Sequence, residues 1–160
     1  MQKKIIACTF FGHRNYRGQE NEFLKQVVIE LIEKHSVNCF YVGHNGGFDR
    51  EVLGVLLSLK EAYTELDLYV VLAYYPPAVE SVDFLQRKEI NLLYPEELES
   101  VPKKFAISYR NNWMVDHSDY VVGYINRSYG GAYAGFVRAG KKGKTVFNIA
   151  QNADRITSRS

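Results

Sequence analysis

Long hydrophobic runs and an excess of charge of one sign are both missing from this 160-residue sequence. No apolar run approaches the roughly 20 residues that a membrane-spanning helix needs, so we expect no partner in the membrane. The 20 Lys and Arg residues nearly balance the 18 Asp and Glu residues, which leaves a formal charge of +2. This near balance argues against a protein that coats duplex nucleic acid, because such a protein needs a broad basic face. It leaves room for one local phosphate site.

Cysteine is also scarce, with Cys8 and Cys39 as the two thiols of the sequence. Both lie inside apolar runs, and two buried thiols in a chain of this size favour the reducing cytoplasm over a disulfide framework. The apolar stretch near the N-terminus ends at Gly12. It is too short for a secretory signal and predicts a first strand instead.

Several catalytic and cofactor signatures are absent as well. The first predicted strand is followed by Gly12-His13-Arg14 rather than by the Gly-x-Gly-x-x-Gly of dinucleotide-binding folds. The sequence has no Gly-x-x-x-x-Gly-Lys-Ser/Thr and no Gly-x-Ser-x-Gly, which excludes a P-loop ATPase and disfavours an α/β-hydrolase. His13, His44 and His117 share no metal-ligand spacing. We therefore predict neither a metal site nor a bound cofactor.

Short β-rich runs alternate with amphipathic stretches along the chain. The expected strands are 4–11, 38–42, 66–74, 90–94, 119–125 and 144–149, and the expected helices are 19–34, 48–63, 106–117 and about 131–139. This alternation is typical of βαβ units. It predicts an α/β fold, a Rossmann-like three-layer sandwich with a mainly parallel sheet, as a single domain over residues 1–150. Residues 151–160 are expected to form a polar C-terminal tail.

Three loops that follow predicted strands combine glycines with polar side chains, namely 12–18, 43–47 and 126–131. In parallel sheets, ligands bind at the carboxyl ends of the strands, where glycines let the backbone approach a ligand and helix N-termini attract anions. The ligand contacts predicted from these loops are Gly12, His13, Arg14, Gly46, Gly47, Gly130 and Gly131. Arg127 could add a contact of the same kind as Arg14. The alternative, that these glycines serve only as turn residues, stays open.

Four motifs occur in a fixed order along most of the chain. They are Thr9–Arg14, Gly46–Asp49 followed by Glu51, Arg110–Asp119, and Tyr129–Gly131. This series resembles the YpsA/DUF1273-like branch of the SLOG superfamily from about Thr9 to Ile149, and more distantly the Lonely Guy and DprA proteins. The resemblance implies a Rossmann-like fold that binds a nucleotide or a nucleotide-derived signalling ligand, with Arg110 and Asn111 as further contacts. Arg110 could instead pair with Asp116 or with a helix end.

The resemblance also bears on catalysis. Lonely Guy proteins hydrolyse nucleoside monophosphates with a glutamate six residues after a Gly-Gly pair, and Val137 occupies the corresponding position here. Because valine moves no proton, we expect a sensor or ligand-binding protein, and whether the chain is an enzyme stays open. The alternative is a nucleotide N-glycosidic hydrolase that uses Asp49 or Glu51, of which Asp49 is preferred because the two point in different directions on a helix. A second alternative is a DprA-like DNA-binding module.

The predicted helix 48–63 has an unusually wide apolar face. Its members are Val52, Leu53, Val55, Leu56, Leu57 and Leu59. Such a face covers more than the single stripe that packing on a sheet requires. It suggests a homodimer or a higher oligomer.

Overall fold

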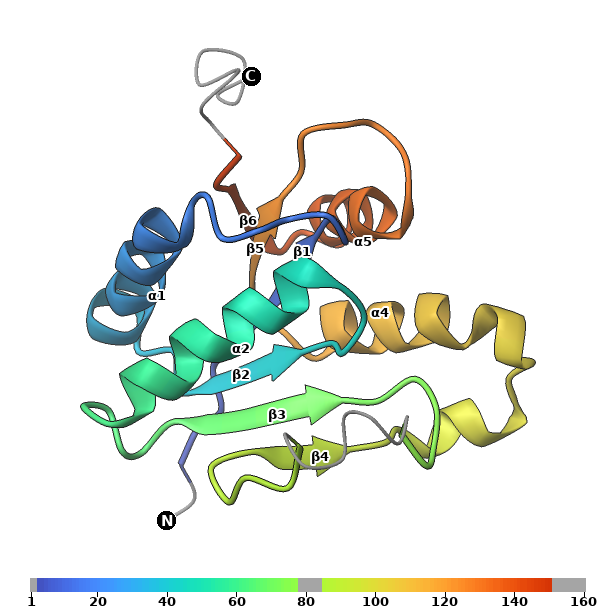
Figure 1. Cartoon of the computed structure of the whole chain (residues 1–160), viewed down its shortest axis with the longest axis horizontal. Coiled ribbons are helices and arrows are strands. Elements are labelled where there is room, and N and C mark those ends of the chain that lie inside the picture. The colour runs from blue at the N-terminus through green and yellow to red at the C-terminus, as the bar shows by residue number, and fades with distance from the viewer. Residues whose placement is uncertain (1–2, 78–84, 151–160) are drawn as a thin grey trace.

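The computed structural model describes residues 3–77 and 85–150, which fold into three layers (Figure 1). A central sheet lies between α1 and α2 on one face and α4 and α5 on the other. This arrangement confirms the expected Rossmann-like α/β sandwich. The polar tail expected at 151–160 lies outside the described residues. Within the described part of the chain, no helix is both long and apolar enough to cross a membrane.

The observed elements agree with the expected ones to within a few residues at each end. The strands are β1 (Ala7–Gly12), β2 (Cys39–Val42), β3 (Asp67–Val71), β4 (Asn91–Leu93), β5 (Tyr120–Tyr124) and β6 (Thr145–Asn148). The helices are α1 (Asn21–His35), α2 (Gly47–Lys60), α4 (Ala106–Asp116) and α5 (Gly131–Lys141), with short 3-10 helices η2 (Glu96–Ser100) and η3 (Lys103–Phe105).

The order of the strands creates a crevice at the middle of the sheet. The described strands form one six-stranded sheet in the order β4-β3-β2-β1-β5-β6, and each neighbouring pair is parallel. From β1 the chain first moves outward through β2, β3 and β4, and then returns to the other side of β1 with β5. The order therefore reverses between β1 and β5. At such a switch point the loops after the two strands diverge, and ligands of open α/β sheets bind there.

Strand β1 is buried on both faces because it lies between two cores. Phe10 packs with Phe40 at 6.1 Å between ring centroids in the core under α1 and α2. Phe11 points to the opposite face, where it joins Met114 of α4 in the second core. A strand covered on both faces needs a nearly continuous apolar sequence, which is the pattern that marked β1 in the sequence.

The wide apolar face of α2 is covered within the chain. Helix α2 packs on β1 and β2 and also against α1, and Val52, Leu53 and Leu56 are at most 2% exposed. A helix held between a sheet and a neighbouring helix buries two stripes rather than one. The width of this face therefore gives no support to the oligomer that it suggested.

Candidate functional site

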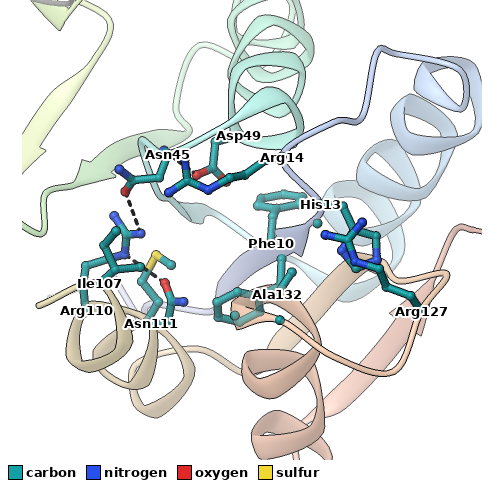
Figure 2. A pocket seen from close by; sticks show the side chains of 15 residues that line it. Phe10, His13, Arg14, Asn45, Asp49, Ile107, Arg110, Asn111, Arg127 and Ala132 are labelled. Carbon is teal, nitrogen blue, oxygen red and sulfur yellow. Dashed lines mark hydrogen bonds between the residues drawn. The ribbon is translucent and has the colours of Figure 1, made fainter. Parts of the chain in front are cut away.

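A pocket of about 400 Å³ opens at the switch point of the sheet (Figure 2). Its lining comes from the carboxyl end of β1, the loop after β2, the first turn of α2, helix α4, and the loop that leads from β5 into α5. A volume of this size lies in the range of small-molecule sites.

Most of the residues expected at the site lie together in this pocket. They are Gly12, His13, Arg14, Asp49, Arg110, Asn111, Gly130 and Gly131. Asn45 and Arg127 also line it. Asn45 was missed in the sequence because its partner, Arg110, lies 65 residues later in the chain. The one feature of the sequence that could have indicated Asn45 as a site residue is its place in a glycine-containing loop after a strand.

Three expected residues lie outside the lining. Gly47 is buried and its N–H donates to the carbonyl oxygen of Arg14 at 2.8 Å, so this N–H does not face a ligand. A Cβ at Gly46 would lie 2.7 Å from Cγ of Arg14, which indicates that the glycine pair lets two loops pack closely. Glu51 accepts a hydrogen bond from Asn21 at 2.8 Å on the α1 side of α2. In the observed arrangement these three residues contact other parts of the protein and lie outside the pocket lining.

Arg14 and Arg127 are the cations of the pocket with open hydrogen-bonding capacity. The Arg14 side chain is exposed and makes no hydrogen bond or ion pair with the described residues. The Nε atom of Arg127 is enclosed without a hydrogen-bond partner in the described structure, and its guanidinium lies 5.0 Å from the centre of the Tyr129 ring. The terminal NH2 groups of Arg127 make no hydrogen bond with the described residues either, so both guanidinium groups retain donors for an anion.

The hydrogen-bond donors of Arg110 bind mainly to acceptors of the protein itself. Its guanidinium is buried and donates to Asn111 Oδ1 at 3.0 Å, to the Val71 carbonyl at 2.9 Å and to Asn45 Oδ1 at 2.9 Å. These bonds fasten α4 to the ends of β2 and β3 and fix one wall of the pocket. Burial lowers the pKa of Arg110, and the nearby carboxylate of Asp49 opposes that shift.

Asp49 is the single acidic side chain of the pocket lining in the described structure. Its Oδ2 accepts the N–H of Asn45 at 2.8 Å. Burial raises the pKa of this carboxyl group, while Arg110 and the Asn45 hydrogen bond act in the opposite direction. One carboxylate among three arginines leaves the pocket with a positive field, which favours an anionic ligand.

His13 lies beside Arg127 in the pocket wall (Figure 2) and is 2% exposed. The backbone N–H of Asn126 donates to its Nε2 at 3.1 Å. An imidazole that accepts a hydrogen bond at Nε2 is neutral and carries its proton on Nδ1. Burial lowers the pKa of His13, and the charge of Arg127 adds to the effect.

The N-terminus of α5 is open toward the pocket. Gly130 has a φ of +99°, a backbone conformation that favours glycine, and α5 has no side-chain cap. A Cβ added at Gly130 or Gly131 would meet no protein atom within 4 Å. The first N–H groups of a helix lack partners within the helix, so this end of α5 offers free donors and space at the same place.

The described residues contain no group of three His, Cys, Asp or Glu side chains placed to hold a metal ion.

Asp116 pairs with Arg138 of α5 at 3.2 Å rather than with Arg110, so the expected alternative that Arg110 pairs with Asp116 is wrong.

Comparison with known proteins supports the fold. No protein-family model and no curated protein matches the chain. Among solved structures, the chain is similar to DNA processing protein A (DprA) from Streptococcus pneumoniae, with a TM-score of 0.65 and 18% sequence identity over 90% of this chain. The match covers 50% of the DprA chain, so the present chain spans about half the length of that protein. The chain therefore has a DprA-like Rossmann fold.

Proposed function

We propose that this protein binds a nucleotide or a nucleotide-derived ligand in the pocket between β1, α4 and α5, as a sensor or ligand-binding protein. The observation that carries the proposal is the open N-terminus of α5, where Gly130 and Gly131 leave space and the Arg127 side chain lies in the same pocket lining. A phosphate at this position would accept hydrogen bonds from the first N–H groups of the helix. Arg14 would approach it from the loop after β1.

The rest of the pocket suits the less polar part of such a ligand. Ile107 and Met114 of α4 contribute apolar surface to the lining. Asn111 accepts from Arg110 through Oδ1, which leaves its NH₂ group as a donor. A base or a sugar would thus find apolar contact together with a few polar groups, as small-molecule sites generally provide.

We also propose that residues 1–150 form one SLOG-type domain of the YpsA/DUF1273-like branch. The support is the series of motifs from Thr9 to Ile149 together with the DprA-like fold. Gly12 and Arg14 of the first motif line the same pocket as Gly130 and Gly131 of the last.

A nucleotide N-glycosidic hydrolase is the second candidate, and Asp49 is the observation that favours it. Its carboxyl group lines the pocket, where it could stabilise positive charge that develops on a sugar carbon. Val137, at the position of the Lonely Guy glutamate, is absent from the lining. Incubation with nucleoside monophosphates and NAD, with free base followed by chromatography, tests this candidate. Turnover should fall with Asp49→Asn and persist with Glu51→Gln, and equal turnover in both variants would exclude the mechanism.

A thermal-shift screen against nucleotides, cyclic dinucleotides, ADP-ribose and NAD tests the main proposal. A ligand at 100 times its dissociation constant should stabilise the fold by about 2.7 kcal/mol. The similarity to a protein named for DNA processing supplies the rival, a nucleic-acid-binding module. Binding of single-stranded DNA with a steep salt dependence, combined with no shift by any small ligand, would favour that rival.

A further inference from the structure

The hydrogen bond between His13 and Asn126 joins the two loops that flank the switch point. His13 follows β1, Asn126 follows β5, and the two residues lie 113 positions apart in the chain. The bond ties the first residue of the arginine-bearing loop, 126–130, to the end of the central strand.

This bond is the last anchor before Arg127. Ile125 is held by the side chain of Asn148, which accepts its N–H at 3.1 Å and donates to its carbonyl at 2.9 Å. His13 then holds the N–H of Asn126. From 127 to 129, no backbone group has a hydrogen bond within the described part of the chain. The position of Arg127 therefore depends on the Asn126 anchor more than on any bond of its own.

The anchor exists in one protonation state of the histidine. The Asn126 N–H needs the lone pair of Nε2, and an imidazolium has a proton at that position. The charged groups around the His13 ring are Arg127 of the 126–130 loop, Arg14 next to His13 in sequence, and Asp49 and Arg110 across the pocket. Tyr124 of β5 packs edge-on against the ring at 6.3 Å. Burial and the charge of Arg127 both favour the neutral ring.

We propose that His13 is a positioning residue: as a neutral acceptor it holds the 126–130 loop, and with it Arg127, in the arrangement that binds an anion. This proposal rests on the proposed function, since it concerns the same site. Protonation of His13 breaks the bond and releases the loop, so anion binding weakens in acid. A histidine that simply touched the anion would behave in the opposite way, because its positive charge would strengthen binding.

Sulfate is the probe for the test because it keeps both charges over the relevant pH range, whereas a phosphate monoester takes up a proton near pKa ~6. Sulfate is titrated into the protein at about pH 7.5 and at about pH 5, and the amide resonance of Gly131 is followed by NMR. The affinity should fall roughly fivefold or more at the lower pH, a typical coupling between two sites. His13→Gln, whose amide oxygen keeps an acceptor without titrating, should retain the affinity at both values. His13→Leu, which removes the acceptor, should bind weakly at both.

Failure of this inference and failure of the proposed site give different results. No sulfate shift of Gly131 in the wild-type protein at about pH 7.5 would overturn the proposed anion site itself. Binding that is unchanged or tighter at an acidic pH where NMR shows the His13 ring to be protonated would overturn the positioning role alone. Because a variant could fail to fold, the wild-type protein without ligand provides a second measurement. The chemical shift of the Asn126 amide should change with pH, with the same midpoint as the titration of the His13 ring. A chemical shift that stays constant through that titration would refute the anchor.

Discussion

Three arginines line the pocket, and the groups around each guanidinium give it a different part in the site. Arg110 is enclosed by three acceptors of the protein, so it holds the wall together. Arg14 is exposed without a bond to the described residues, and Arg127 keeps an unpaired Nε. The sequence could indicate that Arg14 and Arg127 follow strands and that Arg110 lies on a helix, but not which of their donors bond within the folded chain. That distinction depends on contacts between segments far apart in sequence.

Arg14→Ala should reduce the affinity for the nucleotide that gives the largest thermal shift by about tenfold or more, because a hydrogen bond to a charged group contributes about 1.5–3 kcal/mol. Fold stability should change little, since the side chain is exposed. Arg17→Ala is the matched control, because Arg17 is exposed in the same loop and lies outside the pocket lining. Calorimetric titration measures both variants, and equal affinities in the two would remove Arg14 from the site.

Asp49 gives a prediction on the pH dependence of stability. Burial raises its pKa above the ordinary value of 3.8. A carboxyl group whose pKa is higher in the folded state favours folding in acid, and this contribution is lost as the pH rises through the folded pKa. Asp49→Asn removes the titration, so the unfolding free energy of the variant relative to wild type should increase from about pH 4 to about pH 7. Urea unfolding at both values measures it, and a relative decrease would contradict the raised pKa of Asp49.

At the scale of elements, the two glycine-rich helix starts turn out to have different roles. At the start of α2, a Cβ on Gly47 would lie 2.6 Å from the carbonyl oxygen of Arg14 and closer still to that of Tyr16. At the start of α5, a Cβ on Gly131 would meet no protein atom within 4 Å. The sequence predicts both helices correctly and shows a glycine pair at the start of each. It cannot separate a glycine needed for packing from one that leaves space, because the neighbouring atoms come from other elements.

Gly47→Ala should destabilise the fold by about 1–3 kcal/mol, because backbone carbonyl groups cannot give way to the added methyl group. The matched control is Gly54→Ala in the same helix, where the position is exposed and a Cβ would meet no atom within 4 Å. That change should stabilise the helix by about 0.5–1 kcal/mol. Thermal unfolding compares the two, with about 2–4 °C expected per kcal/mol. Similar midpoints for both variants would contradict the close packing of the β1 and β2 loops.

At the scale of the whole molecule, the α/β class and the parallel sheet follow from the alternation of apolar runs with amphipathic stretches. The placement of the site needs more than this alternation, because it depends on the strand order that puts β5 beside β1. The width of the α2 face was misleading for a related reason. A sequence shows how much apolar surface a helix carries, but not that α1 covers the second stripe.

The central claim is that a phosphate of the ligand lies on the open N-terminus of α5, and the Gly131→Ala and Gly140→Ala pair tests it most directly. Both glycines belong to α5, and a Cβ at either would meet no protein atom within 4 Å. Only Gly131 lines the pocket in the described structure. In Gly131→Ala the added methyl group should keep the phosphate away from the N–H groups of the helix, so hydrogen bonds to a charged group are lost. Calorimetric titration of the nucleotide selected by the thermal-shift screen should then show a loss of affinity of about tenfold or more, with no loss of fold stability. Gly140→Ala should bind like the wild-type protein. Wild-type affinity in Gly131→Ala would contradict the account.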